Sequence, residues 1–131
     1  MKTVPWLLLA AALACGISTQ EAQLDLPLPA TGDAFTVAVS VLTQFGYVAK
    51  SMDRQAGFIR AERRQPRTLD LALEWGLTIT IVGDSGTRRI LLQPENLGGR
   101  GTVYEGRVQP DQQAQTDSIA AAIISRLQPH P

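Results

Sequence analysis

Apolar and polar positions alternate strictly from residue 69 to residue 81, and this is the longest regular pattern in the chain. Polar or small residues separate its apolar members, which are Leu69, Leu71, Leu73, Trp75, Leu77, Ile79 and Ile81. Successive side chains of a strand point to opposite faces, so a period of two predicts a strand with one buried and one wet face. Gly76, in the middle of the run, predicts a bulge or a bend.

Two other segments have the spacing of helices. Residues 33–46 predict the first helix, with Thr31 or Asp33 as candidate N-cap and Gly46 placed to end it. The apolar stripe of this helix consists of Phe35, Ala38, Val39, Leu42 and Phe45. From Pro110 to about Leu127, proline occupies the first turn, acidic residues come early and Arg126 comes late, as a helix dipole prefers. The stripe of this second helix is Ile119, Ala122, Ile123 and Leu127.

The remaining strands are short and separated by turns. Residues 47–52 and 58–64 flank a five-residue turn and predict a hairpin, and further strands are expected at 88–93 and 102–108. Connections this short require antiparallel pairing. We therefore expect an α+β fold in the order α-β-β-β-β-β-α, with a four- to five-stranded antiparallel sheet. Both helices should cover one sheet face, and the other face should be open to solvent or to a partner.

The N-terminus is typical of an exported protein. Residues 1–14 resemble a signal peptide, with Lys2, a short apolar stretch and small residues before Cys15. The apolar stretch is about 13 residues long, whereas spanning a bilayer takes about 20. Cleavage before Cys15 is compatible with simple secretion or with acylation of Cys15. An unpaired exported thiol favours acylation, because it has no other evident use.

Residues 15–32 are then predicted to be a lipidated cysteine and a flexible tether, since Pro27 and Pro29 favour extended backbone. The alternation of Leu24, Leu26 and Leu28 leaves a short edge strand as the competing interpretation. A single domain is expected over residues 33–128, followed by a tail at 129–131.

A lipobox-like leader, a proline-containing tether and a helix–hairpin–sheet–helix domain together resemble the small bacterial envelope lipoproteins. Residues 42–63, LTQFGYVAKSMDRQAGFIRAER, are similar to their helix–strand–"D…G"–strand unit. The helix-grip domains of the outer-membrane assembly lipoprotein BamC are the best-known comparison. The resemblance implies an interaction role in the envelope, and it carries over no catalytic residues. Gly16, after the cysteine, is compatible with sorting to the outer membrane.

Charge changes this picture only locally. The formal net charge is zero, so no overall field attracts nucleic acid, and export also disfavours that partner. One basic run stands out, consisting of Arg60, Arg63, Arg64 and Arg67. Guanidinium groups match phosphate and carboxylate oxygens, so the run is a candidate contact surface for anionic lipid or an acidic protein. Alternatively, its charge protects a strand end from edge-to-edge pairing.

Motifs that suggest catalysis lack the partners their chemistry needs. The sequence GDSG at 83–86 resembles the surroundings of a nucleophilic serine, but the only histidine is His130, beside the C-terminus. Residues 96–102, NLGGRGT, precede an expected strand rather than the helix of a phosphate loop. Asp70 and Glu74 would lie about 13 Å apart along a strand, too far for paired catalysis. We therefore expect no enzyme, no metal and no cofactor.

The sequence thus predicts a non-catalytic lipoprotein of the outer membrane, anchored through Cys15, with its domain facing the periplasm. It would act as an adaptor or assembly accessory through contacts with an envelope protein. The alternative is a carrier of a lipid or other apolar ligand between helices and sheet, with Phe58, Trp75 and Tyr104 lining the cavity. A cavity between the layers would favour the carrier, and a filled core with an exposed apolar or arginine-rich face would favour the adaptor.

Overall fold

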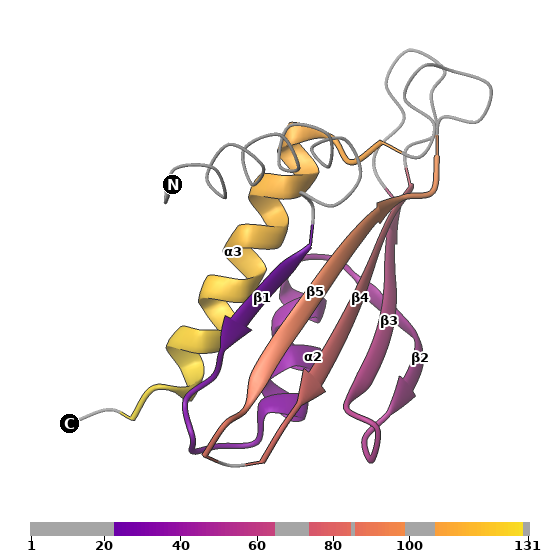
Figure 1. Ribbon diagram of the computed structural model, residues 1–131. Coiled ribbons are helices and arrows are strands. Elements are labelled where there is room, and N and C mark those ends of the chain that lie inside the picture. Colours follow the sequence, from indigo (N-terminus) through magenta and orange to yellow (C-terminus); the bar gives the residue numbers. More distant parts are fainter. Residues whose placement is uncertain (1–22, 65–73, 85, 99–106, 130–131) are drawn as a thin grey trace, which may run out of the picture.

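The fold is a five-stranded antiparallel sheet with two helices on one of its faces (Figure 1). The computed structural model describes residues 23–64, 74–84, 86–98 and 107–129. The strand order across the sheet is β1-β5-β4-β3-β2. The α+β class, the antiparallel pairing and the placement of the helices are confirmed. The elements are β1 (Leu24–Pro27), α2 (Ala34–Gln44), β2 (Val48–Asp53), β3 (Phe58–Arg64), β4 (Glu74–Val82), β5 (Arg89–Asn96) and α3 (Pro110–Leu127).

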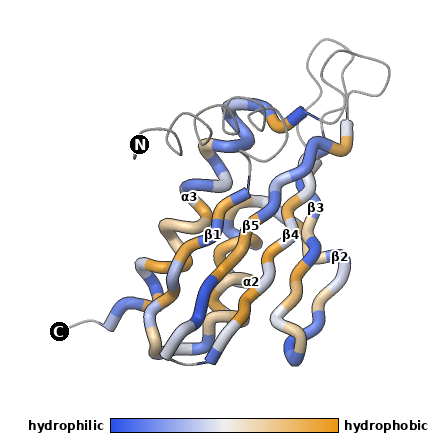
Figure 2. The backbone as a smooth tube through the Cα atoms, viewed as in Figure 1, coloured by the Kyte–Doolittle hydropathy of each residue, from blue (hydrophilic) through white to orange (hydrophobic). Residues whose placement is uncertain are grey.

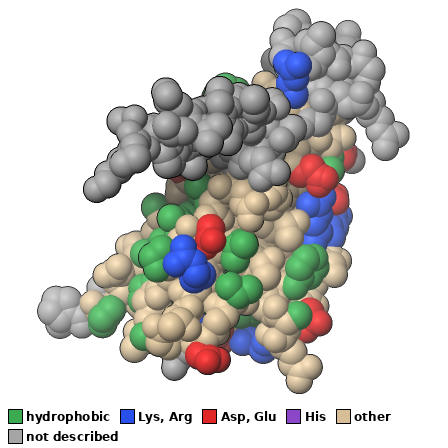
Figure 3. Space-filling view, viewed as in Figure 1, with side chains coloured by type: hydrophobic (Ala, Val, Ile, Leu, Met, Phe, Trp, Pro, Cys, Tyr) green, Lys and Arg blue, Asp and Glu red, His purple; other side chains and the backbone are tan. Residues whose placement is uncertain are grey.

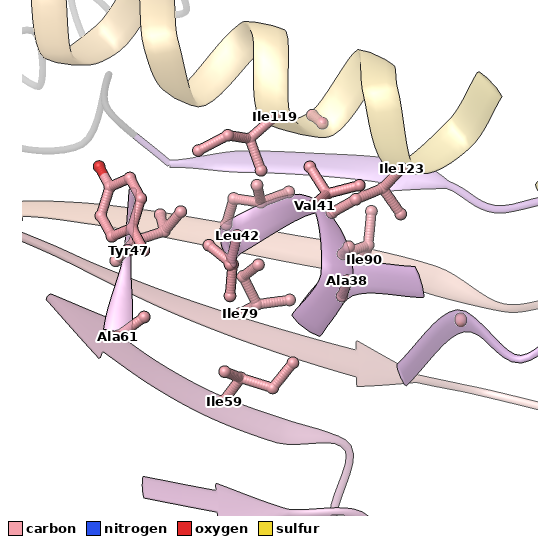
Figure 4. Packing of buried hydrophobic residues seen from close by; sticks show 14 of the residues in the cluster. Ala38, Val41, Leu42, Tyr47, Ile59, Ala61, Ile79, Ile90, Ile119 and Ile123 are labelled. Atoms are coloured by element: carbon pink, nitrogen blue, oxygen red, sulfur yellow. The ribbon is translucent and has the colours of Figure 1, made fainter. Parts of the chain in front are cut away.

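The alternation along β4 decides which sheet face is buried. Leu77 and Ile79 are 0% exposed on the face that meets the helices, and Thr78 and Thr80 are half-buried on the opposite face. Figure 2 shows the hydrophobic segments of strands and helices gathered in the middle of the domain. Figure 4 shows how the two helices contribute to this core. Its members with no exposed surface include Ala38, Val41, Ile59, Ile90, Leu92, Ile119 and Ile123.

Local signals set the helix ends. Asp33 is the N-cap of α2, and its side chain accepts a hydrogen bond from the Thr36 backbone N–H at 3.1 Å. Gly46 follows the C-cap residue Phe45 with φ of 86°, a left-handed conformation that glycine adopts without a Cβ penalty. Pro110 lies in the first turn of α3, where its missing N–H costs no helical hydrogen bond. The predicted helix ends are confirmed in both cases.

Leu24–Pro27 form the edge strand β1, so the prediction of a flexible tether is wrong for these residues and the competing interpretation is confirmed. Leu24 pairs with Leu92 and Leu26 pairs with Ile90, and both leucines pack against the core. Burial of these side chains offsets the entropy lost on ordering the segment. The elements therefore run β-α-β-β-β-β-α along the chain. Residues 1–22, which include Cys15, lie outside the described part, as does most of the predicted strand 102–108.

Gly76 does not interrupt β4. The register of β4 with β3 and with β5 continues through Gly76 without a shift, so the predicted bulge is wrong. A Cβ atom at residue 76 would lie 2.7 Å from Nη2 of Arg60, whose side chain crosses the strand at this point. A side chain at residue 76 would therefore displace the guanidinium of Arg60 from its place across β4. The register shift that does occur is in β2, between Ala49 and Ser51.

Pro94 is tolerated inside β5 because its missing N–H faces the β1 side, where the described residues form no pair with it. Leu28 N–H donates to the Arg88 carbonyl at 2.9 Å, so even-numbered residues of β5 face β1. The pairing with β1 starts at Leu24, opposite Leu92, and Pro94 lies beyond that point. The ladder between β5 and β4 therefore keeps its hydrogen bonds.

The one-sided burial of β4 predicts a large difference between two adjacent substitutions. Leu77→Asp puts a carboxylate at a position that has no exposed surface. We expect it to lower the free energy of unfolding by several kcal/mol, out of a total of about 5–15 kcal/mol. Thr78→Asp, on the open face, should lower the free energy of unfolding far less. Urea denaturation of both variants measures this difference, and equal losses would contradict the assignment of the two faces.

Candidate functional site

The basic run of β3 is divided between the two sheet faces. Arg60 pairs with Thr78 and lies on the open face, whereas Arg63 pairs with Trp75 and lies on the helix face. Arg64 is the last residue of β3, its side chain is outside the described part, and Arg67 is outside it altogether. Arg60 and Arg63 therefore do not belong to one continuous surface.

Arg60 is held flat against the open face. Its Nη1 donates to Oγ1 of Thr78 at 3.1 Å, and its Nη2 pairs with Oε1 of Glu95 at 3.2 Å. The side chain is 23% exposed and lies across Gly76, so the guanidinium reaches from β3 over β4 to β5. Because it is already oriented, such an arginine loses little further entropy when a partner contacts it.

Arg63 serves the other face, beside the C-terminal end of α2. A Cβ atom at Gly46 would lie 3.3 Å from Nε of Arg63, so the arginine packs against this turn. Burial raises the pKa of the neighbouring Tyr47 to about 12, and the charge of Arg63 opposes that rise. The side chain of Arg63 is therefore half-buried and packs against the domain, rather than standing free in solvent.

The open face combines an apolar centre with charged pairs. Phe58, Thr80 and Leu91 form one cross-strand row, and all three are half-buried without a layer of helices over them. Val48 and Val82 add side chains that are 59% and 40% exposed. Figure 3 views this face, with hydrophobic side chains between basic and acidic ones. Such a mixture is typical of protein contact surfaces.

The two sheet edges are poorly suited to adding another strand. Pro27 lies on β1 at a position whose backbone nitrogen points away from β5, so the free edge lacks that N–H donor. On the other edge, the irregularity at Lys50 disrupts the pattern of β2. Both devices discourage edge-to-edge pairing, which leaves the open face as the larger surface for contact.

A groove of about 300 Å³ lies at the N-terminal end of α2, where its lining includes Asp33, Phe35, Arg54 and Arg88. Arg54 pairs with Asp33 at 3.1 Å and lies 4.8 Å from the centre of the Phe35 ring. Hydrogen bonds from the side chain and the backbone of Thr36, together with Arg54, lower the pKa of Asp33 to about 2.

At this end of the domain, Arg88 binds the connection between β1 and α2. Its guanidinium donates to the backbone carbonyls of Pro29, Thr31 and Gly32. The charged groups of the groove are thus engaged in holding the fold. Sequence reasoning missed this cluster apart from Asp33, because its members come from separate segments.

Polar atoms without partners gather at the opposite end of the space between the helices and the sheet. Tyr47 Oη, Trp75 Nε1, Gln112 Oε1 and Gln115 Oε1 are buried and accept or donate no hydrogen bond within the described part of the chain. Gln112 and Thr116 are 0% exposed and continue the stripe of Ile119 toward the start of α3. Their helical spacing with Ile119 was the signal that could have revealed this polar extension.

The sequence motifs considered for chemistry do not assemble a reactive centre in the described residues. Gly83, Asp84 and Gly86 of the GDSG segment lie between β4 and β5, where Thr87 N–H donates to the Asp84 carbonyl at 2.9 Å, and Ser85 lies outside the described residues. No group of three or more His, Cys, Asp or Glu side chains that could hold a metal occurs within residues 23–64, 74–84, 86–98 and 107–129. Asp70, Tyr104 and His130 lie outside these ranges.

Neither of the helices is long and apolar enough to cross a membrane, as far as the described residues extend. No protein-family model matches this chain, and no curated protein is similar to it at a significant level.

The depressed pKa of Asp33 predicts acid-sensitive stabilisation at the start of α2. The folded value of about 2 lies below the ordinary 3.8, so Asp33 stabilises the fold above pH 3.8, and that contribution is lost as the pH falls toward 2. We expect Asp33→Ala to lower the melting temperature at neutral pH, with a difference from wild type that shrinks between pH 4 and pH 2. Asp84→Ala controls for removing an exposed carboxylate. A difference that stays constant down to pH 2 would contradict this role.

Proposed function

We propose that this protein is a non-catalytic lipoprotein of a bacterial outer membrane, anchored through acyl chains on Cys15, with its domain in the periplasm. It acts as an adaptor or assembly accessory by binding a partner protein on the open face of the sheet. The observation that carries this proposal is the uncovered five-stranded face, on which Phe58 and Leu91 flank Thr80 in one row beside the oriented guanidinium of Arg60.

The chemistry of the face defines the partner it suits. Phe58 and Leu91 require an apolar patch opposite them, because contact there removes apolar surface from water. Arg60 and Glu95 offer a guanidinium and a half-exposed carboxylate near the middle, where oriented arginines often dominate binding. Arg89 and Asp25, paired at 2.7 Å on the rim, contribute less because solvent screens them. A protein surface with an apolar centre and polar groups of both signs fits this pattern.

The alternative function, a carrier with its ligand between helices and sheet, is less well supported. Side chains with no exposed surface, among them Val41, Leu77 and Ile123, fill the middle of the interlayer space. Phe58 cannot line a cavity there, since it lies on the open face. The groove near Asp33 is at the rim of the domain, outside the apolar core.

The anchor is tested by Cys15→Ser, which removes the acyl acceptor. We expect the wild-type chain in the membrane fraction and the variant in the soluble fraction or as an uncleaved precursor. Two or more acyl chains, at about 0.8 kcal/mol for each buried CH₂, account for stable attachment of the wild type. Cell fractionation with immunodetection measures this, and a wild-type protein found wholly in the soluble periplasm would refute the anchor.

The contact surface is tested by placing a photo-crosslinking amino acid at Thr80, in the centre of the open face. In intact envelopes we expect one discrete adduct, whose partner is identified by mass spectrometry and then tested as a purified protein. Ser118, exposed on α3, is the matched control position and should give no such adduct. Thr80→Glu should weaken the purified complex by about tenfold or more, which corresponds to about 1.4 kcal/mol, with little change in melting temperature. Adducts at Ser118 but none at Thr80 would contradict the proposal.

A further inference from the structure

β1 lies at the edge of the sheet and precedes every other described element along the chain (Figure 1). Within the described part it pairs with β5 alone. Separation of β1 would therefore break no pairing among the other four strands, and it would leave both helices connected to them through the chain. An element in such a position can open while the remainder of a domain stays folded.

The centre of the core is built by the elements that would remain. The hydrophobic side chains with no exposed surface all belong to α2, β3, β4, β5 or α3, and Figure 4 labels several of them. Leu24 and Leu26 of β1 are only half-buried, and Leu28, just after the strand, is 8% exposed. The packing of β1 thus adds to a core that the other elements already form.

Two consecutive arginines supply the polar contacts that hold this segment. Arg88 donates to three backbone carbonyls in the connection between β1 and α2. Arg89 pairs with Asp25 at 2.7 Å, and the two side chains are 47% and 51% exposed. Solvent screens an exposed ion pair, and water replaces the lost hydrogen bonds when carbonyls separate from a guanidinium. These contacts therefore position the segment without fixing it permanently.

The entropy of the chain opposes this arrangement. Residues 24–32 include four strand residues on a single ladder and five residues of connection, and each must give up backbone freedom to be ordered. The ordering of β4, by contrast, is supported by ladders on both sides and by buried side chains such as Leu77 and Ile79. Residues 24–32 belong to the least stable part of the described domain on these grounds.

We propose that residues 24–32, which we call the strap, leave the sheet as one unit while α2, α3 and the other four strands stay folded. Release of the strap lengthens the connection between the membrane anchor and the domain. The release itself is a property of the domain, whereas its effect on the distance from the membrane rests on the proposed acylation of Cys15.

The change in reach follows from the number of residues. With the strap in place, nine residues separate Cys15 from Leu24, and they extend to at most about 30 Å at about 3.3–3.6 Å per residue. With the strap released, eighteen residues separate Cys15 from Asp33, and they extend to about 60 Å. Release thus doubles the distance at which the open sheet face can meet a partner protein.

The point of attachment also moves along the sheet. β1 starts at Leu24, opposite Leu92 in the middle of β5. Asp33 lies in the groove that also includes Arg88, just before β5 begins. A domain held by the strap and a domain held at Asp33 are therefore pulled from different places, so release changes the orientation of the open face as well as its reach.

Amide hydrogen exchange of the mature full chain, labelled with nitrogen-15 and followed by NMR, measures the release. Leu28 N–H donates to the Arg88 carbonyl at 2.9 Å, and the alternation of the ladder directs Leu26 N–H toward β5 as well. We expect the protection factors of these two amides to be at least about tenfold lower than those of β4. Equal protection of the strap and β4 would overturn the proposal, because both would then open only by global unfolding.

A conservative core substitution far from β1 provides the matched comparison. Ile59→Val, in β3, removes one methylene from a side chain with no exposed surface. It should lower the protection of β4 by about two- to tenfold and leave that of Leu26 and Leu28 unchanged, because the contacts of residue 59 persist when the strap is released. A proportional loss in both segments would show one cooperative unit and contradict the proposal.

A reversible disulfide across β1 and β5 tests the same motion from the other side. Asp25 and Leu91 are register partners on the open face, in a non-hydrogen-bonded pair whose usual Cα separation suits a disulfide. In Asp25→Cys/Leu91→Cys, oxidation should raise the protection of Leu26 and Leu28 to that of β4, and reduction should lower it again. Protection that is the same in both redox states would overturn release as the route of exchange.

The anchor and the strap fail in different measurements. A wild-type chain found wholly in the soluble periplasm refutes the anchor and the change in reach, whatever the exchange rates are. A membrane-bound chain whose strap and β4 are equally protected overturns the strap proposal and leaves the anchor intact. The wild-type and Ile59→Val measurements decide the matter even if the double cysteine variant does not fold.

Discussion

Packing of two helices against a single face of the sheet is the constraint on which the rest of the structure depends. The inward side chains of β4 and β5, such as Ile79 and Ile90, have no exposed surface only because α2 and α3 lie over them. Each helix has an apolar stripe that must be covered, and one sheet face of five strands is wide enough for both. The opposite face is left uncovered as a direct result, and the same division separates Arg60 from Arg63.

The uncovered face and the sheet edges differ in how they can bind other chains. A face with half-buried side chains can bind a partner without altering the hydrogen bonds of the sheet, whereas an open edge can pair with other chains without selectivity. Pro27 and the irregular stretch around Lys50 weaken the two edges. On the face, Arg60 is oriented by Thr78, Glu95 and the absence of a side chain at Gly76. These features together favour contact through the face.

The two ends of the sheet differ in how their polar groups are satisfied. At the end near Asp33, the carbonyls of the connection before α2 are bound by Arg88, and Asp33 itself is bound by Thr36 and Arg54. At the other end, Trp75 and Gln112 have buried atoms with no partner in the described part of the chain. The described chain also enters the sheet at that second end, where β1 begins at Leu24.

The sequence by itself determined the elements whose signals are local. The period of two identified the buried face of β4, and Pro110, Asp33 and Gly46 marked helix ends, since caps and alternation act over a few residues. Tertiary structure alone decided features that depend on distant partners. Four residues of β1 are too few to specify a strand without β5 beside them. The role of Gly76 depends on Arg60 in the next strand, and the polar surroundings of Trp75 come from β3, β5 and α3 at once. Neither can be read from neighbouring residues, because contacts between distant segments exist only once the sheet register and the helix packing are formed.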